Sequence, residues 1–202
     1  MIDLPSGDFC AYIFDCDGTL ADSMPAHFRA WSRALGELSP EIVYSERMFY
    51  EWGGKPTVQI VKDLNTLFPY AKPLDASFIA ETKERYFLEE LTHILPIASI
   101  VSIAREAKAN NIAVAVASGG IHHIVEKTLV HIGMKDFFPI IVTPADVARG
   151  KPFPDMYLLA AEKMGVKPER CLVFEDSPTG IEAARAAGMA WVLVPSHPPL
   201  PE

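Results

Sequence analysis

Five short apolar runs are spaced along the chain, each four to six residues long. They are Phe9–Phe14, Ile112–Ala117, Phe138–Val142, Cys171–Phe174 and Trp191–Val194. Stretches with helical spacing of apolar residues lie around the last four runs, over Ile97–Ala109, Ile121–Ile132, Asp155–Met164 and Pro178–Ala187. Short, continuous apolar runs are typical of buried strands. Because such strands alternate here with helices, the pattern predicts an α/β fold with a parallel sheet covered on both faces.

The interval between the first two runs is too long for an ordinary crossover between parallel strands. Almost a hundred residues separate Phe14 from Ile112, whereas such a crossover seldom needs more than about forty. The interval contains three stretches with helical spacing, namely Pro25–Leu38, Thr57–Phe68 and Asp75–Leu91. The pattern therefore predicts a helical insertion over residues 22–92, within a core formed by residues 1–21 and 93–202.

The composition limits the classes of partner. Half of the 202 residues are hydrophobic, and 18 basic against 26 acidic residues give a net charge of −8, which repels nucleic acid and anionic lipid. No apolar run approaches the roughly 18 residues that a membrane span needs. The first basic residue is Arg29, so the N-terminus lacks the basic region of a signal peptide. The three cysteines suggest free thiols in a reducing compartment. We therefore expect a cytoplasmic monomer with neither nucleic-acid nor membrane partners.

Acidic residues follow two of the predicted strands. Asp15 and Asp17 come after the first strand, and Glu175 and Asp176 come after the fourth. Ligands of open parallel sheets bind beyond the carboxyl ends of the strands, so these four side chains are expected to converge. A single aspartate at such a position is usually a helix cap. Four converging carboxylates repel one another unless a cation is present, and their oxygens suit Mg²⁺.

Residues suited to phosphate binding follow two other strands. Ser118 and Gly119 come after the second strand and offer a hydroxyl and backbone N–H groups, and Lys151 follows the third strand. Together with Mg²⁺, these groups describe a phosphate site. Asp15 then has two possible roles, as a metal ligand only or as both ligand and nucleophile. Asp17 is placed to protonate a leaving oxygen and then to deprotonate water.

The same residues do not match three other motifs that bind phosphate or metal ions. A Walker loop would need Gly five residues before Gly150–Lys151 and Ser or Thr after it, but Ala145 and Pro152 stand there. An EF-hand loop beginning at Asp15 would need Glu at its twelfth position, which holds Ala26. The chain has no CxxC pair, so the sequence predicts no zinc site.

Four segments resemble, in order and spacing, the four motifs of the haloacid dehalogenase superfamily. They are Asp15-Cys-Asp17-Gly-Thr19-Leu, Ser118, Lys151-Pro-Phe-Pro-Asp155 and Phe174-Glu-Asp-Ser-Pro-Thr-Gly180. The resemblance extends over nearly the whole chain. It implies a Rossmann-like α/β core with a helical cap inserted after the first strand, and a reaction that uses a phospho-aspartyl intermediate and Mg²⁺.

The resemblance also implies a role for each matching acid. Asp15 would be the nucleophile and a metal ligand. Asp17 would be the acid–base residue and would bind the metal through its backbone carbonyl. Thr19 would orient Asp17 or steady the loop. Glu175 and Asp176 would complete the metal site.

Binding of the phosphate and of the rest of the substrate is implied for further residues. Ser118 and Lys151 would hold the transferring phosphoryl group. The segment Asp22-Ser-x-x-x-His27 is similar to the β-phosphoglucomutase-like branch of the superfamily, which makes His27 a candidate substrate contact. Lys55 and Lys83 are further candidates in the cap, although most lysines are simply solvated.

The cap departs from the mutases of that branch. The mutases carry an arginine in a glycine-containing cap segment, where it holds a second phosphate. Here the segment reads Gly53-Gly54-Lys55-Pro56-Thr57, with Thr57 at the position of that arginine. After the second motif, the polar residues of the mutases are replaced by Gly120, Ile121 and His122. These departures resemble small sugar-phosphate phosphatases of the fructose-1-phosphatase type.

We therefore expect a Mg²⁺-dependent phosphatase whose substrate is a small phosphorylated sugar or a similar phosphate ester. A β-phosphoglucomutase-like phosphomutase is the alternative among enzymes. A non-catalytic phospho-acceptor or regulatory module is the alternative of another class. Asp17 argues against that module, because a phospho-acceptor needs no acid two residues from the acceptor carboxylate.

Overall fold

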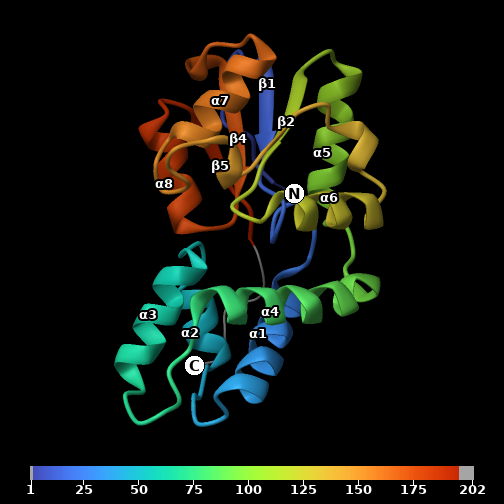
Figure 1. The fold of residues 1–202 in the computed structure, drawn as a ribbon. Helices are drawn as coiled ribbons and strands as arrows, with labels where there is room; N and C mark the ends of the chain where they lie inside the picture. Colours follow the sequence, from blue (N-terminus) through green and yellow to red (C-terminus); the bar gives the residue numbers. More distant parts are fainter. Residues whose placement is uncertain (1, 196–202) are drawn as a thin grey trace. The chain divides into compact units, whose positions relative to one another are not determined.

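A computed structural model describes residues 2–195 of the chain (Figure 1), and these residues form two compact units. The larger unit comprises residues 2–23 and 94–195, and the smaller one comprises residues 24–93. The last seven residues of the chain, which the sequence assigns to the core, lie outside the described part.

The larger unit is built on a parallel sheet. Within residues 2–195 the sheet has five strands in the order β3-β2-β1-β4-β5. These strands are β1 Ala11–Phe14, β2 Ala113–Ala117, β3 Ile141–Val142, β4 Cys171–Glu175 and β5 Ala190–Leu193. In β1, Ala11 pairs with Ala113 of β2 on one side and with Cys171 of β4 on the other. The predicted parallel α/β core is confirmed, with β1 at its centre.

Helices cover both faces of this sheet (Figure 1). They are α5 Ala98–Ala109, α6 His122–His131, α7 Asp155–Met164 and α8 Pro178–Ala186. Tyr12 and Phe14 of β1 pack in the core on the side of α5 and α6, whereas Ala11 and Ile13 pack on the side of α7 and α8. Because successive side chains of a strand point to opposite faces, a strand covered on both sides is apolar throughout. This arrangement accounts for the uninterrupted apolar run in the sequence.

Two predicted strands are shorter in the structure. β1 begins at Ala11 rather than at Phe9, and the third run forms a strand only at Ile141–Val142. Pro139 has no N–H to donate to a ladder, and Phe138 instead packs its side chain into the core on the side of α5 and α6. The strand positions are otherwise within one residue of those expected at β4 and β5.

The smaller unit is helical and has its own apolar core. Its helices are α1 Met24–Leu38, α2 Glu46–Glu51, α3 Thr57–Leu67 and α4 Ala76–Glu90. Ion pairs of 2.8 Å join Arg29 to Glu90 and Arg33 to Glu89, and so connect α1 with α4. The sequence did not predict α2, whose six residues are too few for a periodic pattern. Among the helices of residues 2–195, none has both the length and the hydrophobicity to cross a membrane.

Candidate active site

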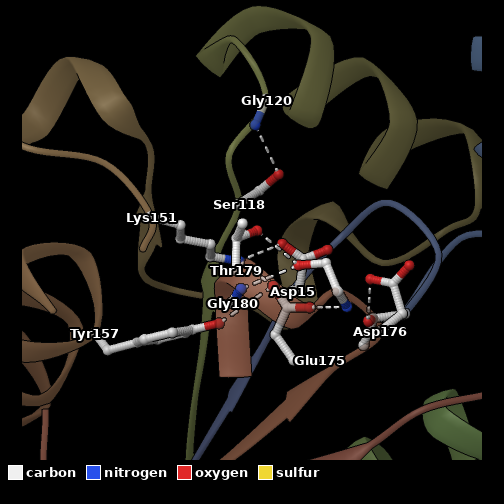
Figure 2. Close-up of polar contacts among 11 residues, drawn as sticks. Asp15, Ser118, Gly120, Lys151, Tyr157, Glu175, Asp176, Thr179 and Gly180 are labelled. Carbon is white, nitrogen blue, oxygen red and sulfur yellow. Dashed lines mark hydrogen bonds and ion pairs between the residues drawn. The ribbon is translucent and has the colours of Figure 1, made fainter. Parts of the chain in front are cut away.

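Three carboxylates meet where β1 and β4 end. Asp15 directly follows β1, Glu175 is the last residue of β4, and Asp176 comes next. Because Phe14 pairs with Phe174 in neighbouring parallel strands, both segments leave the sheet at the same edge (Figure 2). One oxygen from each of the three carboxylates lies within 4.8 Å of the others. The structure thus brings together three of the four acids singled out by the sequence.

Lys151 lies between two of these carboxylates. Its Nζ is 2.7 Å from Oδ1 of Asp15 and 2.7 Å from Oε1 of Glu175, and its side chain is only 6% exposed. Burial lowers the pKa of Lys151, but Asp15 and Glu175 outweigh that effect and hold the pKa well above its ordinary value. Lys151 is therefore a buried cation in contact with the proposed nucleophile.

The charges of this cluster are not balanced. Burial raises the pKa of Asp15 well above its ordinary value; Lys151 lowers it, and the carboxylates of Glu175 and Asp176 raise it again. With all three carboxylates ionised, as metal binding requires, the single ammonium of Lys151 would leave an excess of two negative charges in a largely buried site. A divalent cation would remove that excess. Since every donor is an oxygen, the set fits Mg²⁺.

Both carboxylate oxygens of Glu175 accept hydrogen bonds. Its Oε2 accepts a hydrogen bond of 2.6 Å from the backbone N–H of Ser177, and its Oε1 accepts from Lys151 and, at 3.5 Å, from the hydroxyl of Tyr157 (Figure 2). Burial raises the pKa of Tyr157 well above its ordinary value, so the phenol is neutral and can donate. An added Cβ on Gly180 would overlap the Glu175 carboxylate. Close approach of the helix backbone therefore requires glycine at this position.

Asp17 lies in the loop after β1. The hydroxyl of Ser23, which is fully buried, donates a hydrogen bond of 2.6 Å to Oδ1 of Asp17. An added Cβ on Gly120 would lie 3.4 Å from Oδ2 of Asp17 and 3.3 Å from Oγ of Ser118. The second carboxylate oxygen of Asp17 therefore lies close to the loop that follows β2.

Ser118 and Gly119 are the first two residues of that loop, directly after the end of β2 at Ala117. The Ser118 side chain is buried, and its Oγ accepts a hydrogen bond of 3.1 Å from the backbone N–H of Gly120 (Figure 2). Gly119 is exposed, with nothing within 4 Å of an added Cβ. The hydroxyl is thus oriented by the backbone, while the residue after it is open to solvent.

Thr19 links the first loop to the loop after β4. Its side chain is fully buried, and its Oγ1 lies 3.4 Å from Oδ1 of Asp176. The contact joins the loop after β1 to the loop after β4. It also restrains a carboxylate of the acidic cluster.

The candidate substrate contacts of the helical unit have partners within that unit. The His27 ring stacks on Phe87 with 3.9 Å between ring centroids, and its Nδ1 lies 2.9 Å from Nζ of Lys83. Nζ of Lys55 lies 3.0 Å from Oδ2 of Asp63. The charge of Lys55 is therefore compensated by a neighbouring carboxylate.

The cysteines are free thiols, as expected. Cys10 is half-buried, whereas Cys16 and Cys171 are buried. Cys16 stands between the two acids of the first motif, where burial, Asp17 and Asp15 all raise the pKa of its thiol well above the ordinary value. A thiol that stays protonated is a poor nucleophile.

Sequence reasoning did not assign a function to three residues that shape the site. These are Ser23, Tyr157 and Gly180. Ser23 and Gly180 lie inside segments that carry the family resemblance, and no other feature of the sequence indicates that they belong to the site. Tyr157 stands in the apolar pattern of α7, where nothing but its hydroxyl distinguishes it from a core residue.

The chain matches known proteins over most of its length. A family model described as haloacid dehalogenase-like hydrolase matches residues 10–188. Fructose-1-phosphate phosphatase YqaB of Escherichia coli (strain K12) is 35% identical over 184 residues, which cover 90% of this chain and 94% of that protein.

Solved structures agree with this match. The crystal structure of CbbY from Rhodobacter sphaeroides in complex with phosphate has a TM-score of 0.76 and 28% identity, and the match covers 91% of this chain and 84% of that one. β-Phosphoglucomutase from Clostridium difficile has a TM-score of 0.78 and 25% identity, with coverages of 91% and 83%. The chain therefore belongs to the haloacid dehalogenase-like hydrolases and is a phosphoric monoester hydrolase.

Proposed function

We propose that the chain is a Mg²⁺-dependent phosphatase that hydrolyses a small phosphorylated sugar or a similar metabolite through a phospho-aspartyl intermediate. The contact between Asp15 and Lys151 carries this proposal. A carboxylate that attacks a phosphate dianion meets like-charge repulsion, and here the carboxylate is paired with a buried cation. The likeness to a fructose-1-phosphate phosphatase supports a sugar phosphate as the class of substrate.

In the first step, Asp15 acts as the nucleophile. One of its carboxylate oxygens forms a bond to phosphorus, while the bond from phosphorus to the sugar oxygen breaks. Lys151 and the hydroxyl of Ser118 bind the phosphoryl oxygens, next to the backbone of Gly119. The ammonium of Lys151 offsets the negative charge that is transferred to Asp15.

Asp17 moves the proton in both steps. Protonated Asp17 gives its proton to the leaving sugar oxygen, and the resulting carboxylate then takes a proton from water. That water attacks phosphorus, which releases inorganic phosphate and restores the carboxylate of Asp15. The hydrogen bond from Ser23 to Oδ1 orients the carboxylate of Asp17 for these transfers.

Asp15, Glu175 and Asp176, with the backbone carbonyl of Asp17, would hold Mg²⁺. When bound, the ion supplies positive charge to the phosphoryl oxygens and to the attacking carboxylate. The chain contributes the orientation of the ligands, since Thr19 contacts Asp176 and the surroundings of Glu175 fix its carboxylate.

The helical insertion, assigned to residues 22–92 from the sequence, is proposed to act as the cap that contacts the substrate, through His27 and Lys55. The compensation of Lys55 by Asp63 supports a substrate with a single phosphate, because a paired lysine is a weak site for a second one. Thr57, at the position of the mutases' arginine, supports the same conclusion.

The likeness to a β-phosphoglucomutase makes a phosphomutase the second candidate. A phosphomutase uses the same nucleophile and acid but transfers the phosphoryl group to a second sugar hydroxyl. A phospho-acceptor module is less well supported, because it does not need the hydrogen bond that positions Asp17.

A panel of phosphorylated metabolites tests the proposal. We expect the wild type to release inorganic phosphate from a sugar phosphate, EDTA to abolish the release and Mg²⁺ to restore it. Asp15→Asn should be inactive, since an amide is a poor nucleophile, whereas Asp17→Asn should bind phosphate and lose more than about a hundredfold in rate. The exposed Asp136 provides a matched control, Asp136→Asn, with unchanged turnover.

Two results would contradict the proposal. Turnover by Asp15→Asn at the rate of the wild type would exclude Asp15 as the nucleophile. A wild type with no turnover over a broad panel with Mg²⁺ would favour the phospho-acceptor module.

A further inference from the structure

Tyr157 of α7 contacts two charged residues of the site. Its hydroxyl lies 3.5 Å from Oε1 of Glu175, and Nζ of Lys151 lies 5.1 Å from the centroid of its ring (Figure 2). We propose that Tyr157 is a positioning residue that fixes the Glu175 carboxylate and the Lys151 ammonium for binding of the metal and the phosphoryl group. This inference rests on the proposed function.

Tyr157 is held rigidly. Its side chain is completely buried and belongs to the apolar core on the side of α7 and α8, together with Ile13 and Ala117 of the central strands. A closely packed aromatic ring has a single orientation, because neighbouring atoms exclude its other rotamers. Its hydroxyl and its face therefore have fixed positions at the end of the sheet.

The hydroxyl gives Oε1 of Glu175 a second donor in the absence of substrate, and this donor becomes more important when Lys151 turns towards a substrate. Oε2 of Glu175 has its own donor in the backbone of Ser177, but Oε1 shares Lys151 with Asp15. A phosphoryl group that draws the ammonium towards itself weakens the contact between Lys151 and Oε1. A buried carboxylate oxygen without a donor is costly. Tyr157 supplies a donor that no substrate competes for.

The ring has a second effect, on Lys151. An ammonium over an aromatic face is attracted by the ring's electrons. A third carboxylate at this position would hold Lys151 more strongly and would compete with the substrate. The neutral ring of Tyr157 positions the ammonium of Lys151 without neutralising its charge, which can then bind the phosphoryl group.

The test compares Tyr157→Phe with Tyr44→Phe. Tyr44 is also a buried phenol, and within residues 2–195 its hydroxyl has no hydrogen-bond partner. Each variant loses one buried hydroxyl and keeps its ring. We expect Tyr157→Phe to bind Mg²⁺ about tenfold more weakly in titration calorimetry without substrate, as is typical when a partner of a metal ligand is lost. Tyr44→Phe should bind Mg²⁺ like the wild type, and both variants should melt near the wild-type temperature.

A second variant, Tyr157→Leu, removes the ring as well. We expect it to lower kcat at saturating Mg²⁺ further than Tyr157→Phe does, because Lys151 loses its aromatic neighbour. Circular dichroism checks that it is folded; if it is not, the comparison of the two phenylalanine variants decides.

The outcomes separate this inference from the function on which it rests. Binding of Mg²⁺ by Tyr157→Phe within twofold of the wild type overturns the role of Tyr157, and so does an equal loss in Tyr44→Phe. If the wild type neither binds Mg²⁺ nor releases phosphate, the proposed function itself fails. An active wild type with unchanged Tyr157→Phe leaves the proposed function intact and removes only Tyr157 from the site.

Discussion

The hydroxyl of Ser23 donates a hydrogen bond of 2.6 Å to Oδ1 of Asp17. Ser23 is fully buried and is the last residue of the larger unit before the helical unit begins at Met24. The orientation of the proposed acid–base residue is therefore fixed by the residue at which the chain leaves the core.

Ser23→Ala should reduce kcat about tenfold. A hydrogen bond to a charged group contributes about 1.5 kcal/mol, and 1.4 kcal/mol corresponds to a factor of ten in rate. Steady-state kinetics on the best substrate of the metabolite panel measures the effect. Ser39→Ala is the control, since the buried hydroxyl of Ser39 donates to the carbonyl of Lys72 in the helical unit. It should lower stability without changing kcat, and a similar loss of kcat in both variants would contradict the role of Ser23.

Gly180→Ala should lower both activity and stability. The new methyl group would overlap the Glu175 carboxylate, so that either the carboxylate or the start of α8 must move. We expect at least a tenfold loss of kcat, and a decrease of about 1–3 kcal/mol in the free energy of unfolding, as is usual for overpacking. Gly36→Ala, in α1 with nothing within 4 Å of the added Cβ, should instead stabilise by about 0.5–1 kcal/mol. Urea unfolding and kcat are the measurements, and unchanged values for Gly180→Ala would show that the site tolerates a Cβ.

Product analysis distinguishes the phosphatase from the mutase. A mutase holds a bisphosphate in two orientations and lets a sugar hydroxyl react before water. Since Lys55 is paired with Asp63 and Thr57 is uncharged, we expect a weak hold on a second phosphate. With β-glucose 1-phosphate and a trace of glucose 1,6-bisphosphate, inorganic phosphate should accumulate. Rapid formation of glucose 6-phosphate with little phosphate released would establish the mutase instead.

Asp146 should make the stability depend on pH. The backbone N–H of Thr143 donates to its carboxylate at 2.8 Å and is the main cause that lowers the pKa of Asp146 below its ordinary value of 3.8. Because the folded state binds this proton more weakly, the stabilisation is present above the unfolded-state pKa and is lost as the pH falls through the folded-state pKa. Asp146→Ala should therefore cost about 0.5–1 kcal/mol at pH 7 and less below pH 4 (about the usual pKa). Urea unfolding from pH 7 to pH 3 tests this, and a constant difference would exclude the carboxylate charge as the cause.

The architecture was predictable because burial on both faces leaves a strong signal in sequence. The runs that became β1, β2 and β4 are apolar at every position, as strands buried on both faces require. The ends of strands carry less information, because pairing depends on the neighbouring strand; Phe9 is apolar yet lies outside β1. The short helix α2 depends on its cap, Ser45, which accepts a hydrogen bond from the backbone of Met48.

The charged residues of the site were predictable from the sequence. The uncharged residues that contact them, Tyr157 and Ser23, were not. Asp15, Lys151 and Glu175 follow strands whose carboxyl ends share one edge of the sheet, so the topology alone brings them together. Tyr157 and Ser23 contact charged residues that come from other positions in the chain. Periodicity marks Tyr157 only as buried, and no pattern in one sequence indicates which carboxylate a buried hydroxyl will meet.

The central position of β1 has a consequence for how the protein is made. A ribosome releases β1 first, but its neighbour β2 follows only after the whole helical unit, and β4 follows later still. At roughly 5–20 residues per second, the run Phe9–Phe14 waits on the order of ten seconds for its second partner. The helical unit, with its own core, is complete before β2 emerges. During synthesis, β1 is therefore the strand that stays longest without both of its neighbours in the sheet.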